Sequence, residues 1–278
     1  MVLLSNLTVL RFSGEDAADF LHNQVSADVL ALSHGESTFA CYCEPKGRVL
    51  ALMLIAKSDD ASSSKDYLVI MSRSLAATIA MRLKMYVIRA KVSIEVMEDV
   101  SVAGAQSAGE LPSSAGQLTT ITPPDSNNSY VLTEDSSNLS TSSDEINKWK
   151  FSELHKGISW LCPETSAQFL PQMLGFDQIG AVNFRKGCYP GQEIVARIHY
   201  LGKVKRHPRL LCTPDNIDPE PMEELQIQYE SQTVAAVVTD TVRREHGGAC
   251  IFVITRMDPD LIAEKIIYQG QESELVAD

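Results

Sequence analysis

The sequence predicts an α+β protein with two mixed lobes and a small C-terminal antiparallel β-barrel. Helical and strand patterns alternate over the N-terminal part, a polar stretch follows, and short strand runs dominate after Lys203. At 278 residues the chain is long enough for two or three such units. We expect an N-terminal lobe at 1–100, a second lobe at 101–202 and the barrel at 203–278.

The N-terminal lobe is expected to combine two helices with a sheet. Apolar residues at helical spacing predict helices over 17–25 and 75–86. A Pro-Gly turn at 44–47 separates two of the strands. The strands expected from apolar or alternating runs are 7–12, 38–43, 48–56, 67–71 and 88–96.

The second lobe opens with a polar insert at about 105–143, rich in Ser, Thr, Asn, Gly and Pro. Its small apolar content cannot offset the entropy of ordering, so we expect loops there, with only 130–132 strand-like. A capping box at 142–145 then starts a helix, and Gly157 provides its stop signal.

The residues after Lys203 follow an all-β pattern. Turn residues, mostly Pro, Gly and Asp, separate the short strand runs. Closing such strands into a barrel removes exposed sheet edges. The expected strands are 209–212, 225–229, 233–239, 250–255 and 265–268.

The net charge and the hydropathy of the sequence limit the kinds of partner that the protein can bind. A net charge of −12 argues against a nucleic-acid surface covering the whole protein, although a small basic pocket for an anionic ligand remains open. The longest apolar run, 49–56, is too short to span a bilayer, and residues 1–10 lack a signal pattern. We expect a cytoplasmic monomer, or a mature form already processed, without direct nucleic-acid or membrane contact.

The six cysteines are scattered, without Cys-x-x-Cys pairs or zinc spacing. No HExxH, phosphate-loop or dinucleotide motif is present either. We therefore expect no metal site, and free thiols in a reducing compartment. The cysteines are Cys41, Cys43, Cys162, Cys188, Cys212 and Cys250.

Residues 186–193, which we call the signature loop, concentrate the chemistry. Cys188 follows Lys186 and Arg185, and neighbouring cations stabilise a thiolate. Pro190-Gly191 turns the chain into a helix that carries Arg197. The functional interpretation is an exposed, activated thiol at a loop-to-helix junction. The structural alternative is a small buried cysteine in a tight turn with solvated cations.

A second polar cluster interrupts the apolar stripe at the end of the first helix. Gln24 and Asp28 either follow an ordinary helix end or face a ligand cavity. The residues alone leave both interpretations open.

The signature loop resembles the K-G-C-Y-x-G-Q-E motif of the YgfZ-type folate-binding proteins, relatives of the glycine-cleavage T-protein (aminomethyltransferase). Further segments are similar to the same family, at 20–29, 44–48, 169–173 and 202–206. The resemblance implies a three-lobed ring with tetrahydrofolate in its central opening. It also implies a role in maturation or repair of iron–sulfur enzymes, including one that modifies tRNA, with those enzymes or assembly proteins as partners.

Carried over residue by residue, the resemblance makes Cys188 the reactive thiol. The residues that it implies around tetrahydrofolate are Gln24, Asp28, Lys186, Gly187, Tyr189, Gly191, Gln192, Glu193 and Arg197.

The chain departs from the T-protein pattern at two places. The acidic pair that T-proteins carry after the 44–48 turn is replaced by Leu50 and Ala51, which cannot stabilise charge in aminomethyl transfer. The glutamate that binds the pterin edge aligns with His155, or with Glu153 in a shifted register. We expect a folate-dependent accessory protein. The alternatives are a tetrahydrofolate-dependent aminomethyl- or methyltransferase and a folate-binding scaffold without chemistry.

Overall fold

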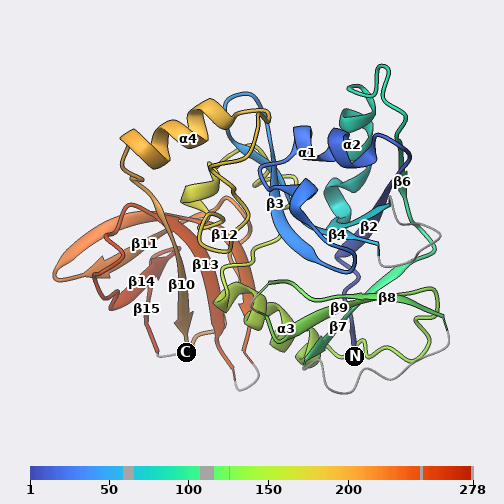
Figure 1. Ribbon diagram of the computed structural model, residues 1–278. Helices are drawn as coiled ribbons and strands as arrows, with labels where there is room; N and C mark the ends of the chain where they lie inside the picture. Colours follow the sequence, from blue (N-terminus) through green and yellow to red (C-terminus); the bar gives the residue numbers. More distant parts are fainter. Residues whose placement is uncertain (59–65, 107–115, 125, 245–246, 277–278) are drawn as a thin grey trace.

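The computed structural model describes residues 1–58, 66–106, 116–124, 126–244 and 247–276. It contains three sheets, in which all neighbouring strands are antiparallel, with helices packed around them (Figure 1). This mixed architecture confirms the predicted α+β class.

The first sheet has the order β3-β4-β5-β2-β6, with α1 and α2 packed against it. Residues 49–56 of β4 are buried throughout, which explains their continuous apolar run. The expected strand at 88–96 is wrong in its first half, because only 93–96 form β6 and Ile88 is 83% exposed. The elements are β2 (Leu7–Ser13), α1 (Ala17–Gln24), η1 (Val29–Ala31), β3 (Ser37–Cys43), β4 (Val49–Lys57), β5 (Tyr67–Ser72), α2 (Arg73–Lys84) and β6 (Ser93–Val96).

The second sheet has the order β1-β7-β9-β8 and occupies much of the polar insert. Its strands are β1 (Val2–Leu3), β7 (Ser101–Gln106), β8 (Gln117–Ile121) and β9 (Asn128–Thr133). The expectation of loops there is wrong for β8, whereas the strand expected at 130–132 is confirmed within the longer β9. Residues 107–115 and 125 lie outside the described residues. Every residue of β9 is buried, and its polar side chains are satisfied locally, as in the 2.8 Å contact between the Ser129 and Thr122 hydroxyls.

The third sheet has the order β10-β13-β12-β11-β14-β15. After β15, the Val276 amide donates to the Cys212 carbonyl at 2.9 Å, so the two edges of this curled sheet meet at one bridge. The sequence pattern missed β15, whose residues are mostly polar. The strands are β10 (His207–Thr213), β11 (Glu224–Tyr229), β12 (Gln232–Arg243), β13 (Ala249–Thr255), β14 (Lys265–Tyr268) and β15 (Gln271–Glu274).

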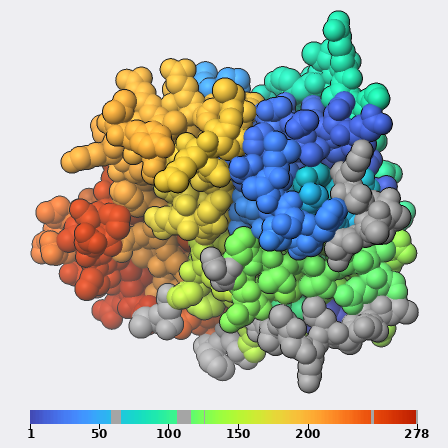
Figure 2. Space-filling view, in the orientation of Figure 1, coloured from blue at the N-terminus to red at the C-terminus, as the bar shows by residue number. Residues whose placement is uncertain are grey.

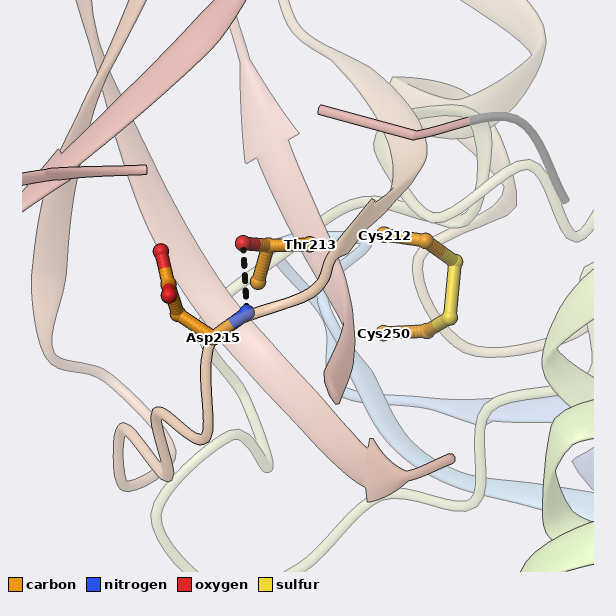
Figure 3. The surroundings of a disulfide bond; sticks show 4 residues. All are labelled: Cys212, Thr213, Asp215 and Cys250. Carbon is orange, nitrogen blue, oxygen red and sulfur yellow. Dashed lines mark hydrogen bonds between the residues drawn. A yellow bond between two sulfur atoms is a disulfide. The ribbon is translucent and has the colours of Figure 1, made fainter. Parts of the chain in front are cut away.

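Cys212 and Cys250 form a disulfide between β10 and β13 (Figure 3). The expectation of six free thiols is therefore wrong for this pair. The strand register places the two residues opposite each other, with their Cα atoms 4.0 Å apart, although 38 positions separate them in sequence. Such pairing depends on the register between strands, which cysteine spacing does not reveal.

Helix α3 (Ser143–His155) lies between the second and third sheets (Figure 1). Leu154 and Phe151 pack against the disulfide and Phe252 of β13. From the same helix, Lys150 donates to the Thr241 carbonyl of β12 at 2.8 Å. These contacts tie the middle of the chain to its C-terminal sheet.

Candidate functional site

The signature loop is held by two interlocking turns. Gly191 has φ +82°, and a Cβ there would lie 2.4 Å from the Glu44 carbonyl oxygen and 2.6 Å from the Gly47 Cα. Gly47 also has a positive φ and packs against Ile194. Only glycine fits this approach without strain. The turn at 44–48 and the signature loop, which both resemble the same family, therefore contact each other. Helix α4 (Gln192–Leu201) begins directly after this contact.

Lys186 is buried and caps the end of α1. Its ammonium donates to the carbonyls of His22 and Val25, the latter at 2.7 Å. Carbonyls at a helix C-terminus lack intrahelical partners and favour a cation. Burial lowers the pKa of Lys186 to about 8, against the opposing effects of Asp28 and Cys188. This cation therefore fixes the signature loop to α1; in Figure 2 the blue and yellow segments adjoin.

Cys188 is exposed, which agrees with the predicted accessible thiol rather than a buried structural cysteine. The loop around it is braced by Gln192, whose side-chain amide donates to the Lys186 carbonyl at 3.2 Å. Glu193 and Arg197 point to solvent from α4. Gly187 is also exposed, and a Cβ there would lie 3.8 Å from the His22 ring.

The 22–28 segment faces the signature loop. His22 Nδ1 lies 3.3 Å from Asp28 Oδ1, and burial together with Lys186 lowers the pKa of His22. Gln24 is half-buried, and its Oε1 has no hydrogen-bond partner among the described residues. The structure thus brings Gln24 and Asp28 to the same end of α1 as Lys186.

Tyr189 lies inward beneath the loop. It is 7% exposed, and the Lys186 ammonium is 5.3 Å from its ring centroid, within range of a cation–π contact. Burial raises the pKa of Tyr189, and Cys43 and Cys41 act in the same direction. Both of these cysteines are buried free thiols, so they serve as packing.

A separate cavity of about 630 Å³ opens beside α3, and we call it the α3 cavity. All three sheets contribute to its wall, through the β1–β2 connection, the β5–α2 junction and β12. Its chemically distinctive lining residues are Arg73, Trp149, Lys150, Glu153, Trp160 and Asp240. Of the residues considered for folate binding from the sequence, only Glu153, in the shifted register, is among the residues that line it.

Glu153 is the most perturbed acid in this cavity. Its carboxylate Oε1 accepts from the Tyr130 hydroxyl at 2.6 Å and from Trp160 Nε1 at 2.9 Å. Burial raises its pKa to about 7, although the hydrogen-bonding contacts with Trp160, Tyr130 and Trp149 act in the opposite direction. Oε1 therefore already accepts two hydrogen bonds, and Trp149 is a further neighbour of the carboxylate.

An ion pair lies on the same wall of the α3 cavity. Lys150 Nζ is 2.5 Å from Asp240 Oδ1, which joins α3 to β12. Burial raises the pKa of Asp240, and Lys150 opposes that change. The cavity therefore combines a partly buried ion pair with a carboxyl group whose pKa is raised to about 7 by burial.

Glu153 was predicted as a pterin-binding residue only if the alignment with the T-protein pattern is shifted. His155, at the aligned position, is exposed and lies 6.0 Å from the Phe151 ring centroid. One signal in the sequence did mark the cavity, because the only two tryptophans, Trp149 and Trp160, bracket Glu153. No sequence pattern connected Lys150, Asp240 and Tyr130 with one another, because they lie in α3, β12 and β9.

The T-protein acidic-pair positions hold apolar residues in the sheet. Leu50 and Ala51 are buried in β4, with 8% and 1% exposure. The Leu50 carbonyl accepts from the Ser166 hydroxyl at 2.8 Å. Neither position therefore presents a side chain that could exchange a proton.

The described residues contain no group of three or more His, Cys, Asp or Glu side chains placed to hold a metal ion. Within the same ranges, no helix has the length and apolar character needed to cross a membrane.

The arrangement of three sheets is the fold of the glycine-cleavage T-protein. The solved structure of the glycine cleavage system aminomethyltransferase T from Bartonella henselae matches with a TM-score of 0.64. The match covers 99% of this chain and 83% of that one at 12% sequence identity, so it establishes the fold alone.

Sequence relatives confirm the resemblance indicated by the signature. The proteins named tRNA-modifying protein YgfZ from Colwellia psychrerythraea and Vibrio atlanticus are 25% and 28% identical to this chain. These matches cover 97% and 76% of this chain, and 89% and 69% of the relatives. An uncharacterized protein of Haemophilus influenzae is 28% identical over 83% of this chain and 79% of its own length. No family model matches the chain.

Proposed function

We propose that this protein binds tetrahydrofolate in the α3 cavity and acts as an accessory protein for iron–sulfur cluster assembly or repair. Its clients would include a tRNA-modifying iron–sulfur enzyme, and Cys188 would be its reactive thiol. The names of the relatives, which refer to tRNA modification, support the tRNA part of this proposal.

The observation that carries the folate part is Glu153. A pterin presents two adjacent N–H donors on one edge, and a carboxylate accepts such a pair well. Glu153 lines this cavity and would accept such a pair, and the neighbouring Trp149 and Trp160 supply apolar walls for a planar ring. A cavity of about 630 Å³ is also in the usual size range for a drug-sized ligand.

Isothermal titration calorimetry with tetrahydrofolate tests the site. Glu153→Gln keeps the side-chain shape but removes the charged acceptor, so we expect a loss of affinity of roughly tenfold to a hundredfold. Glu145→Gln, on an exposed position of the same helix, is the matched control and should bind like the unmodified protein. Absence of binding to the unmodified protein would refute the folate proposal.

The affinity should also depend on pH. Only ionised Glu153 can accept both donors, and its pKa is about 7. Affinity for tetrahydrofolate should therefore fall by up to about tenfold for each unit below that pKa and level off above it. Titration of Glu153→Gln over the same range should show no such step.

The contacts with folate predicted for Gln24, Asp28 and the signature residues remain predictions. The unpartnered Oε1 makes Gln24 the residue to test first. If Gln24 contacts the ligand, Gln24→Ala should weaken tetrahydrofolate binding in the same titration. Unchanged affinity would remove Gln24 from the folate site while leaving the Glu153 test intact.

The thiol role rests on the exposure of Cys188. A thiol reagent should modify Cys188 first in the folded protein, and Cys188→Ala should lose the fast phase. In a strain that lacks the endogenous protein, Cys188→Ala should fail to restore iron–sulfur enzyme activity, whereas Glu145→Gln, at an exposed position of α3, should restore it. Full restoration by Cys188→Ala would exclude the thiol role.

The competing candidate is a tetrahydrofolate-dependent aminomethyl- or methyltransferase, which the T-protein fold would accommodate. The buried, apolar Leu50 and Ala51 argue against it. Turnover of an aminomethyl or methyl donor by the purified protein with tetrahydrofolate would favour this candidate over the accessory role.

A further inference from the structure

A second cavity, of about 460 Å³, lies between the 180–185 segment and the C-terminal half of α4. It shares no lining residue with the α3 cavity. Helix α4 lies at the upper left of the molecule, and residues around 200 form part of its surface there (Figure 1 and Figure 2). The proposed folate and thiol functions do not use this cavity.

Three aromatic rings line it, and we call them the ring stack: Phe184, His199 and Tyr200. Phe184 packs against the main core, and its ring centroid lies 3.6 Å from that of His199, at an interplanar angle of 11°. Tyr200 stands edge-on to His199, with centroids 4.8 Å apart. The His199 ring is exposed, and Tyr200 is 62% exposed. The stack is thus anchored at Phe184 and presents two rings to solvent.

One cation lines the cavity beside these rings, and three more are close in sequence. Arg185 lines the cavity itself, and the exposed Arg197, Lys203 and Lys205 follow within or just after α4. Within the described ranges, none of these four side chains forms an ion pair with a carboxylate. In a chain of net charge −12, Arg185 thus places positive charge beside exposed aromatic rings without a carboxylate partner among the described residues.

We propose that this cavity binds a nucleotide, with the base against the ring stack and the phosphate at Arg185. Stacking on aromatic side chains within a basic groove is the way proteins hold single-stranded nucleic acid. An acidic peptide would pair with the cations but leave the ring faces unused. The proposal departs from our expectation of no direct nucleic-acid contact, which rested on the charge of the whole chain and not on its local distribution.

Fluorescence anisotropy with labelled single-stranded oligoadenylate, in the absence of folate, tests the site. Tyr200→Ala and His199→Ala should each weaken binding roughly fivefold to a hundredfold, the effect of removing a base-stacking ring. Arg185→Ala should weaken binding and reduce its salt dependence. The double substitution Tyr86→Ala with Arg89→Ala, at exposed positions after α2, is the matched control and should leave affinity unchanged.

Competing ligands distinguish the sources of the nucleotide. Displacement of the probe by AMP with equal affinity would identify a free nucleotide, whereas much tighter binding of the oligonucleotide would identify a nucleic-acid strand; both outcomes support the site. No binding, or binding that the ring substitutions leave unchanged, would overturn it. So would equal competition by polyglutamate, which carries charge without bases. Because Glu153 has no part in this cavity, a negative folate titration leaves the test intact.

Discussion

The signature loop and the α3 cavity differ in what their residues do. In the loop, most of the conspicuous residues hold the backbone: Gly191 allows two turns to meet, Lys186 caps α1 and Gln192 braces the loop. Cys188 is the thiol that they leave exposed. In the α3 cavity, the polar side chains instead converge on a space large enough for a ligand. A specific sequence motif can therefore consist mostly of residues that hold a loop in place around one exposed side chain. A cavity large enough for a ligand can instead form from residues that share no motif.

The largest effect is expected at Gly191. Gly191→Ala would place a methyl group against the Glu44 carbonyl and should destabilise the fold by about 3 kcal/mol or more. Gly270→Ala is the control, because Gly270 has the same φ of +82° but no atom within 4 Å of the new Cβ. It should cost only about 1 kcal/mol, the strain of the left-handed conformation. Urea denaturation compares the two, and equal losses would contradict the interlocking turns.

Glu153 should give the α3 cavity a pH dependence between its ordinary pKa of 4.5 and about 7. Burial raises its pKa from 4.5 to about 7, so the folded protein retains a proton that the unfolded chain loses between these values. The resulting stabilisation is complete below about 4.5 and is lost as the pH rises through about 7, a change of about 3 kcal/mol at most.

The test is to measure free energies of unfolding across this range. The stability of the unmodified protein relative to Glu153→Gln should decline with rising pH, whereas its stability relative to Glu145→Gln should stay level. Parallel pH profiles for the unmodified protein and Glu153→Gln would show that Glu153 keeps an ordinary pKa.

Lys186 tests the structural interpretation of the loop. Lys186→Met fills similar space but leaves the His22 and Val25 carbonyls without their donor, so we expect a loss of about 2 kcal/mol. Arg185→Met, at the exposed neighbouring position, should change stability by no more than about 0.5 kcal/mol. If Lys186→Met is as stable as Arg185→Met, the ammonium does not anchor the loop to α1.

Local patterns predicted the helices and most strands because each pattern reports the burial of one face. The run at 49–56 and the start of α4 are examples. Apolar patterns did not predict most of the strand residues in the polar insert. The Thr and Ser residues of β8 and β9 are stabilised there by pairing with neighbouring strands. The disulfide depended on the register of β10 and β13, which is set by the fold as a whole.

The candidate site was likewise predicted only in part from local sequence patterns. Cys188 is exposed, as the functional interpretation of the motif expected, and the 20–29 segment contacts the loop through the carbonyls of His22 and Val25. Ligand contacts of Gln24 and Asp28 stay predictions. Asp240 and Lys150 meet only because α3 crosses to β12. No pattern around either residue contains that information.

Strand β1 has a consequence for how the protein is made. Val2 pairs with Gly104 and Leu3 with Ala103, so these residues join the second sheet across about a hundred positions. During synthesis they must wait outside any sheet until β7 has been made, while β2 to β6 can already pair with one another. Closing so long a loop is slow compared with hairpin formation. Residues 2 and 3 are therefore synthesised about a hundred positions before their partners and join their sheet only after the first sheet is able to form.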